Sequence, residues 1–441
     1  MKQPPSTTSS NKKTKLNLIN IKKILVIGLL LRLLILLVSS SHPDIGNHLD
    51  WGIRFLDLGP KKFYENIFWG VSWPNQPYGS ILLFALMAAL KNGLFSIIEF
   101  INQSIPFFPS FIIPYIETNL HSWMVKLPFI LSDIGIAYLI YKIVYNYKKD
   151  YAKLAAALFI FNPVVIYNST VWGQTDSLIN LLALSGLYFI YNKKYFPGIF
   201  LFLSGFLFKL SLIIYLPIFA LLMLKRIKDW KSFIIPTLSF LFFIYLLAIP
   251  FAFGAKNPFQ WLWYMYTNRV LVRQGSMLNG NAFNFWFLIF GLDFSKSEFS
   301  NFAGLSYQLW SRLFFILTLI PISIKFLKSK LSLNLLLKAL LLSSFSSFLF
   351  LTNMHERYLY PILPIFVILI FLNKSHFTIK YYLIISILHL LNLYNLWFYP
   401  KLPLLKSILV WDNFLVGKVI SLFFIIYFLI IYKQFITHED K

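Results

Sequence analysis

The sequence contains no cysteine and few charged residues. Of its 441 residues only 16 are aspartate or glutamate, and charged residues of both signs make up 13% of the chain. Soluble domains carry about 25% charged residues, so this composition argues against a soluble fold. Without cysteine the chain can form neither disulfide bonds nor thiolate metal sites.

Long apolar runs recur along the whole chain, and 58% of its residues are hydrophobic. Each run is close to the ~20 residues that a helix needs to cross a bilayer. Helices satisfy their own backbone polar groups in hydrocarbon, and these runs are continuous where barrel strands would alternate. The sequence therefore predicts an all-α, polytopic transmembrane protein with about 12 spans. They are expected at about 22–40, 125–146, 152–168, 178–191, 196–208, 211–224, 233–250, 306–324, 332–351, 358–372, 378–397 and 414–432.

Basic residues outnumber acidic ones by 40 to 16, which gives a formal net charge of +24. A basic chain can bind nucleic acid, but here the lysine clusters lie between apolar runs, as cytoplasmic loops do in membrane proteins. We therefore expect no nucleic-acid partner. The same clusters predict a multi-pass cell-membrane protein with both termini in the cytoplasm, and they place the polar loops described below, with any site that these form, on the extracytoplasmic side.

Three segments organise the chain. Residues 1–20 are polar and predicted to be a disordered cytoplasmic tail, and the apolar run after Lys22 and Lys23 is interpreted as an uncleaved signal anchor. We expect an N-terminal catalytic module at 21–251 and a C-terminal transmembrane module at 252–441.

The first extracytoplasmic loop, 41–124, is expected not to span the membrane. Its apolar pieces at 78–90, 94–103 and 107–117 are short, and are interpreted as interfacial helices; a pair of short extra spans is the alternative. The third extracytoplasmic loop, 251–305, has a similar short piece at 283–292.

Polar residues that are hard to explain structurally gather in the extracytoplasmic loops. Asp44 and Asp50 lie within seven residues of each other, just after the first span. A carboxylate there could remove a proton from an acceptor hydroxyl, which is the task of a general base. The alternative is a solvated acid that caps a helix.

Two elements of the first loop resemble known enzymes. Asp44 with Trp51 seven residues later resembles the Asp-Tyr-Glu-Ala-Gln-Arg-His-Trp opening of the glucosyltransferases that build lipid-linked oligosaccharides. Phe68-Trp69-Gly70 followed by Trp73-Pro74 resembles their Tyr-Trp-Gly…Tyr-Pro-Pro element. The sequence departs from these patterns at Asn75 and Gly46, which replace a proline and an acid.

Two later elements resemble bacterial mannosyltransferases related to the enzyme that adds the second mannose of GPI anchors. Asn162-Pro163, then Trp172-Gly173-Gln174 and Asp176, resembles their Asn-Pro…Trp-Gly-Gln-x-Asp pattern. Met354-His355-Glu356-Arg357-Tyr358 resembles their His-Glu-Arg-Tyr element. With four elements in the right order over roughly residues 22–430, the chain resembles the GT-C glycosyltransferases, which use polyprenyl- or dolichyl-phosphate sugars.

The resemblance implies a role for each element. Asp44 would be the catalytic base of an inverting transfer, with Asp50 and then Asp176 as the next candidates. The lipid phosphate would be bound by cationic groups, which stabilise the charge that develops on a leaving group. The candidates are His355, Arg357, Lys209, Arg269 and Arg273; ordinary snorkelling to the interface is the alternative for each.

The sugar pocket is expected to use Trp51, Trp172, Gln174 and Asp176, unless Trp172 is an interfacial anchor and Asp176 a helix cap. Asp133 lies inside a span, and is interpreted as structural, paired with Lys126 or with another helix. His42, Asp44, His48 and His355 could together form a zinc or manganese site, but their spacing is not diagnostic. The resemblance implies enzymes that work without a metal, so neither a metal nor another cofactor is expected.

The expected partners are a polyprenyl-phosphate sugar donor, a glycan, lipid or protein acceptor, and the lipid bilayer. Mannose is the first choice of sugar and glucose the second. Two other functions are kept as alternatives: a polytopic transporter or lipid flippase, whose polar site would lie at mid-membrane, and a polyprenyl-linked glycan polymerase or ligase.

Overall fold

The computed structural model describes residues 20–39, 42–65, 73–226, 229–252, 257–271, 276–372 and 377–437. The described chain is almost wholly helical, with one short antiparallel pair of strands, β1 (Asn301–Phe302) and β2 (Leu305–Ser306). The predicted all-α class is therefore confirmed. The expected tail lies outside the described residues, apart from Asn20.

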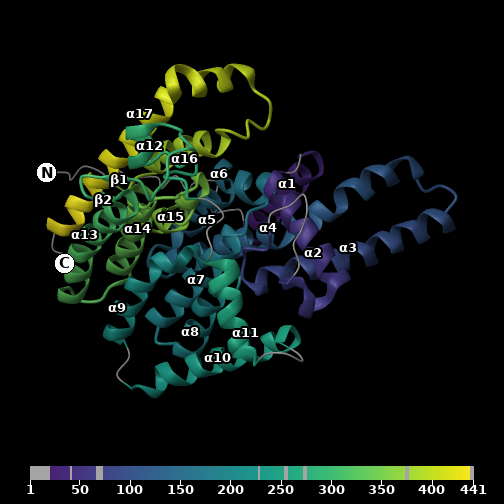
Figure 1. The fold of residues 1–441 in the computed structure, drawn as a ribbon, viewed down its shortest axis with the longest axis horizontal. Helices are drawn as coiled ribbons and strands as arrows, with labels where there is room; N and C mark the ends of the chain where they lie inside the picture. Colours follow the sequence, from purple (N-terminus) through teal and green to yellow (C-terminus); the bar gives the residue numbers. More distant parts are fainter. Residues whose placement is uncertain are drawn as a thin grey trace, which may run out of the picture.

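The helices follow one another in the order drawn in Figure 1. The first half of the chain forms α1 (Ile21–Val38), α2 (Pro43–Phe63), α3 (Tyr78–Ser104), α4 (Ile113–Tyr147), α5 (Ala152–Ile160), α6 (Pro163–Ile166), α7 (Asp176–Tyr191), α8 (Tyr195–Ser204), α9 (Leu216–Arg226) and α10 (Lys231–Ala252). The second half forms α11 (Pro258–Met265), α12 (Phe285–Phe290), α13 (Tyr307–Lys328), α14 (Leu333–Phe350), α15 (Ile362–Leu372), α16 (Ile379–Tyr394) and α17 (Pro403–Thr437).

Short 3₁₀-helical or π-helical turns join several of these helices. Those near the site are the π-helical η4 (Tyr167–Trp172) and the 3₁₀ turns η5 (Gly205–Leu207), η6 (Leu210–Tyr215) and η8 (Glu356–Leu359). π-helical turns are rare and often occur at functional sites.

Local sequence explains where many helices begin. Asn20, Asn162 and Ser332 each precede a helix, and their side chains accept a hydrogen bond from a backbone N–H of the first turn. Such caps satisfy donors that have no partner within the helix. Proline follows His42 and Asn162 at the first helical position, where its missing N–H costs nothing.

Six of the described helices are long and apolar enough to cross a membrane, and eight if each bent pair is taken as one span. The chain therefore has the character of a membrane-embedded helical protein. Three further apolar helices are shorter, Asp176–Tyr191, Tyr195–Leu207 and Ile379–Tyr394. Each predicted span coincides with a helix, but the length criterion supports six to eight spans and not the predicted twelve.

The segment 41–124 differs from the prediction. The pieces expected at 78–90 and 94–103 are one continuous helix, α3, and the piece at 107–117 includes the start of α4. Both helices meet the membrane-span criterion. The prediction of separate interfacial helices there was wrong, because Lys91-Asn92-Gly93 does not break a helix that is apolar on both sides. The far ends of α3 and α4 extend from the body as the two blue helices on the right of Figure 1.

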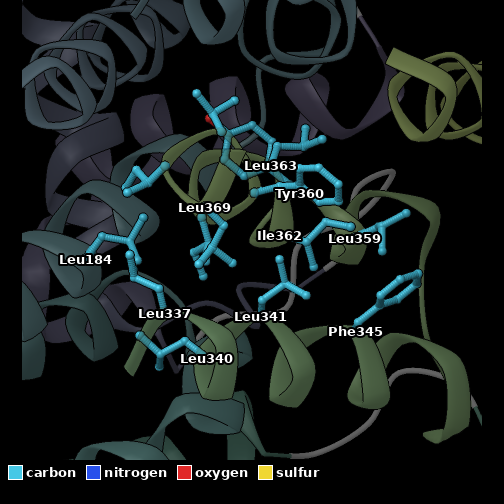
Figure 2. Close-up of a cluster of buried hydrophobic side chains, with 14 of the residues drawn as sticks. Leu184, Leu337, Leu340, Leu341, Phe345, Leu359, Tyr360, Ile362, Leu363 and Leu369 are labelled. Carbon is cyan, nitrogen blue, oxygen red and sulfur yellow. The ribbon is translucent and has the colours of Figure 1, made fainter. Parts of the chain in front are cut away.

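The core lies between α14, α15 and α7. Leu337, Leu340 and Leu341 of α14 face Leu363 and Leu369 of α15, together with Leu184 of α7 (Figure 2). These side chains are nearly all inaccessible to solvent, so α14 and α15 are central helices and not lipid-facing ones. Their packing fixes η8, the turn between them that carries Arg357.

Asp133 of α4 has a full set of partners. It pairs with Arg32 of α1 at 3.3 Å (Nε to Oδ2), and both side chains are 0% exposed. Its oxygens also accept hydrogen bonds from Ser169 (2.5 Å), Ser177 (2.7 Å) and Tyr360 (2.8 Å). The partner is thus on another helix and is not Lys126, and the arrangement supports the structural interpretation.

Candidate active site

One cavity of about 660 Å³ gathers polar side chains from segments far apart in the sequence. Its wall is built by the first turns of α2, the segment 75–77, the start of α7, η6 and the turn between α14 and α15. The charged residues that line it are Asp44, Asp176, Lys209, His355 when protonated, and Arg357.

The start of α2 positions Asp44. His42 caps α2, accepting a hydrogen bond from the Asp44 backbone N–H at 3.1 Å, and Pro43 opens the helix. The Asp44 carboxylate thus lies in the first turn of α2, where the helix dipole stabilises negative charge.

Gln174 and Arg357 hold the Asp44 carboxylate from the opposite side. Gln174 Nε2 donates to Asp44 Oδ2 at 2.7 Å, and Arg357 Nη1 lies 3.7 Å from the same oxygen. The Asp44 side chain keeps 34% of its surface exposed. Burial would raise the pKa of Asp44, but the charge of Arg357, then the histidines and Gln174, lower it to about 2, so the group is an ionised carboxylate at neutral pH.

Gly173 explains how Gln174 reaches α2. Its φ of +83° is a left-handed conformation, which ends the π-helical turn η4. A Cβ at this position would lie 2.4 Å from Ile45 Cδ1 and 2.9 Å from Lys126 Cγ. Only glycine fits between these side chains, so the Trp-Gly-Gln element has a clear structural basis.

Two cations line the cavity on either side of Tyr358. Lys209 Nζ lies 5.4 Å from the Tyr358 ring centre, and the Arg357 guanidinium lies 5.5 Å from it. Lys209 also pairs with Asp176 at 2.9 Å. Arg357 stacks near Trp172, with 5.6 Å between the guanidinium carbon and the ring centre. Two cations on one wall form a site suited to a phosphate.

Glu356 provides a second carboxyl group next to the Arg357 guanidinium. Its Oε1 lies 3.3 Å from Arg357 Nη1, so this one nitrogen faces both Glu356 and Asp44. Burial raises the pKa of Glu356 to about 7, against the opposing charge of Arg357. Glu356 therefore exchanges its proton in the neutral range, while Asp44 stays ionised.

His355 is held by the backbone. It forms bridges with Gly280 and Asn281, and its ring packs where a side chain on Gly280 would have to be. Burial, then the charge of Arg357, lowers the pKa of His355 to about 3. The ring is therefore neutral at physiological pH, and it offers hydrogen bonds but not the positive charge expected for it.

Three of the remaining residues that the sequence predicted for the site do not line the cavity. Asp50 does not line it, and pairs with Arg54 one turn along α2 at 2.7 Å. Arg269 lies over Trp73 at 5.6 Å, also away from the cavity lining. Trp172 packs against His42 with ring centres 4.3 Å apart, behind the lining, whereas Trp51 does line the cavity.

Arg273 and the Phe68-Trp69-Gly70 element lie outside the described residues. Their predicted roles in the site therefore remain predictions.

Among the residues that sequence reasoning did not assign to this site are His48, which it weighed only as a metal ligand, Gln76 and Glu356. His48 is four residues after Asp44, so the helical repeat places both on one face of α2 and could have indicated it. Glu356 is part of the His-Glu-Arg-Tyr element, but only the structure places it against Arg357. Gln76 lies in a loop and carries no sequence signal.

Within the described part of the chain, no group of three His, Cys, Asp or Glu side chains could hold a metal ion. No protein-family model matches the chain, and no curated protein matches it either. Function therefore has to be argued from the site itself.

Proposed function

We propose that this protein is a membrane glycosyltransferase that moves a hexose, with mannose as the first choice, from a polyprenyl-phosphate sugar to an acceptor hydroxyl. The observation that carries the proposal is one cavity in which an ionised aspartate and two cations meet. Asp44 comes from α2, Lys209 from the turn before η6 and Arg357 from η8. A base beside a phosphate-binding wall is the arrangement that direct glycosyl transfer needs.

In this reaction the acceptor oxygen attacks the anomeric carbon of the sugar. As the new carbon–oxygen bond forms, the bond from that carbon to the phosphate oxygen breaks, and the lipid phosphate leaves with the electron pair. Asp44 takes the proton of the acceptor hydroxyl, through Oδ1, because Oδ2 is occupied by Gln174. Direct displacement inverts the anomeric centre, so a β-linked donor gives an α-linked product.

Arg357 connects donor binding to the strength of the base. Its charge holds the pKa of Asp44 at about 2, which makes the carboxylate a weak proton acceptor. A phosphate that draws Arg357 away from Asp44 raises the pKa of Asp44 toward its ordinary value. Asp44 then becomes a stronger proton acceptor when a donor is bound.

The proposal includes the membrane topology read from the charge pattern. In this topology the chain crosses the membrane several times, with both termini in the cytoplasm and the cavity on the extracytoplasmic side. The choice of mannose rests on the Trp-Gly-Gln and His-Glu-Arg-Tyr elements, and glucose is the second choice. Gln174, Asp176 and Trp51 are the residues nearest the sugar in this proposal.

The test is a transfer assay on the purified full-length protein. It uses polyprenyl-phosphate mannose, then the glucose donor, with a panel of glycan, lipid and protein acceptors. Wild type is expected to release polyprenyl phosphate and form an α-linked product. Asp44→Asn is expected to lower kcat by about 10²- to 10⁴-fold, the usual contribution of a general base.

Asp50→Asn is the matched control, because Asp50 lies two turns along the same helix and outside the cavity lining. It is expected to keep nearly full activity. Equal transfer by wild type and Asp44→Asn would overturn the mechanism. Movement of the intact donor across vesicles without bond cleavage would favour the transporter or flippase, and transfer of a whole lipid-linked glycan would favour the polymerase or ligase.

A further inference from the structure

One buried carboxylate lies at the junction of the segments that carry cavity residues. Asp133 of α4 is 0% exposed, and three hydroxyl groups donate hydrogen bonds to it. The donors are Ser169, Ser177 and Tyr360, which lie 36, 44 and 227 positions away in the sequence. None of these four residues lines the cavity. Asp133 therefore joins segments around the site without being part of its lining.

Ser169 anchors the turn that presents Gln174. It belongs to η4, and its Oγ donates to Asp133 Oδ2 at 2.5 Å. The carbonyl of the preceding residue, Asn168, accepts the backbone N–H of Gln174 at 3.0 Å. The Gln174 side chain in turn donates to the Asp44 carboxylate at 2.7 Å. A short chain of hydrogen bonds thus connects Asp133 with the proposed base.

Ser177 and Tyr360 anchor two further segments. Ser177 Oγ donates to Asp133 Oδ1 at 2.7 Å, and Ser177 directly follows Asp176, which lines the cavity. The Tyr360 hydroxyl donates to the same oxygen at 2.8 Å, and the Tyr360 backbone N–H donates to the Arg357 carbonyl at 3.0 Å. The start of α7 and the turn η8 are thus attached to one oxygen atom.

The hydrogen bonds to Asp133 are well suited to fix backbone positions. Arg32 Nε lies 3.3 Å from Asp133 Oδ2 and supplies the opposite charge. Hydrogen bonds to a charged carboxylate are shorter and about twice as strong as those between neutral groups. Ser169, Ser177 and Tyr360 are 0% exposed, so bulk water does not compete for these bonds. Three segments are therefore firmly anchored to one carboxylate.

We propose that Asp133 is a positioning residue, which holds in place the three segments that bring polar side chains to the cavity. These segments are η4 with the following Gln174, the start of α7 with Asp176, and η8 with Arg357. The inference deepens the proposed function, and its kinetic test rests on that function. In the alternative, a purely structural role, Asp133 only joins α4 to α1 through Arg32.

The double variant Arg32→Met with Asp133→Leu separates the two roles. Replacement of both members of a buried ion pair by apolar residues of similar size often leaves stability unchanged or raises it. The three hydroxyl groups keep other partners, because Ser177 and Tyr360 lie 3.2 Å apart and Ser169 lies 3.1 Å from a carbonyl of its own helical segment. The variant should therefore unfold close to wild type, although the common acceptor is gone.

In the full-length double variant we expect kcat/KM for transfer to fall by about 10- to 100-fold, because a displacement of about 1 Å in a site can cost that much. Burial raises the pKa of Asp44, but Arg357 and, more weakly, Gln174 lower it to about 2. Once these groups are no longer held against Asp44, the acid limb of kcat/KM should move up toward 3.8. Normal rates and an unshifted limb at wild-type stability would overturn the proposal.

Tyr360→Phe is the second variant, and it decides the question if the double variant does not fold. It removes one donor, leaves both charges in place, and should lower kcat/KM by about three- to tenfold, the factor for one hydrogen bond. Tyr382→Phe is the matched control, because Tyr382 is 1% exposed, its hydroxyl accepts from Asn162 at 2.7 Å, and it does not line the cavity. Equal rates in these two variants would contradict the positioning role.

Hydrogen–deuterium exchange separates this proposal from the proposed function, because it needs no transfer activity. In the double variant and in Tyr360→Phe, the backbone amides of 167–177 and 356–361 should lose protection, while those of α13 should keep it. This result supports the positioning role even if wild type transfers no sugar, which would overturn the proposed function alone. Exchange that rises uniformly along the chain in Tyr360→Phe, or not at all in these two segments, overturns the positioning role.

Discussion

Two clusters of acids and cations in this protein use the same residue types in opposite ways. Around Asp133, Arg32 and three hydroxyl groups satisfy one carboxylate completely, and both charged side chains are inaccessible. Around Asp44, Gln174 makes one hydrogen bond, Arg357 stays 3.7 Å away, and a third of the carboxylate surface is exposed. A carboxylate whose hydrogen-bond positions are all filled by the protein can only hold helices together. A carboxylate with free positions can still bind a ligand and accept a proton.

The difference arises from where each cluster lies. Asp133 lies in the middle of α4, packed against α1, so every lone pair must find a protein donor. Asp44 lies at the start of α2, where the chain turns and a cavity opens. Four predictions, from the largest expected effect to the smallest, test this contrast, and the second is paired with a counterpart at Asp44.

Removing Asp133, the carboxylate whose hydrogen-bond positions are all filled, should be the most destabilising change. Asp133→Ala leaves Arg32 buried without its partner, and loss of one member of a buried ion pair costs about 3–5 kcal/mol. Thermal unfolding in detergent should show a large fall in the midpoint. Asp44→Ala should cost less, because the Asp44 side chain is a third exposed and Arg357 keeps its contact with Glu356. Equal destabilisation by both substitutions would remove the contrast.

Glu356 should give the protein an unusual pH dependence of stability. Its pKa is raised from 4.5 to about 7 in the folded state, chiefly by burial, so the stability it contributes is fully present below pH 4.5 and lost as pH rises through about 7. The loss is on the order of 3 kcal/mol. Because buried histidines such as His355 also titrate in this range, the measurement is the difference between wild type and Glu356→Gln. From pH 4.5 to 8 the melting temperature of wild type should fall relative to that of the variant.

Asp44 should behave in the opposite way. Its folded pKa is lowered from 3.8 to about 2, so its contribution is present above pH 3.8 and lost only as pH falls through about 2. Asp44→Asn should therefore leave the slope between pH 4.5 and 8 unchanged. A slope that vanished in Asp44→Asn and persisted in Glu356→Gln would reverse the assignment of the two carboxyls.

Gly173→Ala should damage the cavity selectively. A left-handed residue with a Cβ costs about 1–3 kcal/mol, and the new methyl group would push on Ile45, beside Asp44. We expect the free energy of unfolding to fall by this amount. The transfer rate should also fall, because Gln174 would no longer be held against Asp44. Gly46→Ala, at a site in α2 with nothing within 4 Å, is the control and should be neutral or slightly stabilising in the same assays.

Asp50→Asn should have the smallest effect. Its pair with Arg54 is a partly exposed contact between residues four apart on a helix, worth about 0.3–0.5 kcal/mol. The unfolding midpoint and the transfer rate should both stay close to wild type. A loss of activity as large as that of Asp44→Asn would move the base to Asp50.

Much of this architecture was predictable. The apolar runs predicted helices near their observed places, and Asp44, Gln174, Asp176, Lys209, His355 and Arg357 do line one cavity. The error at α3 came from treating Lys91 as a break, although a helix tolerates one polar turn when its neighbours are apolar. Asp50 was placed in the site because it is close to Asp44 in sequence, and Arg269 because it is a cation in a predicted outside loop. Neither property decides the face of a helix or the partner of a side chain.

By itself the sequence determined that the chain is helical and apolar enough to lie in a membrane, because hydropathy and helix capping depend on neighbouring residues only. It also determined which polar elements stand at the ends of the helices. Only the tertiary structure decided which of these residues are in contact. Asp44 and Arg357 form a pair although more than three hundred positions separate them in the sequence. Asp133 pairs with Arg32 and not with Lys126. Such pairings depend on how α1, α4, α14 and α15 pack, and packing is a property of the whole chain that no local pattern contains.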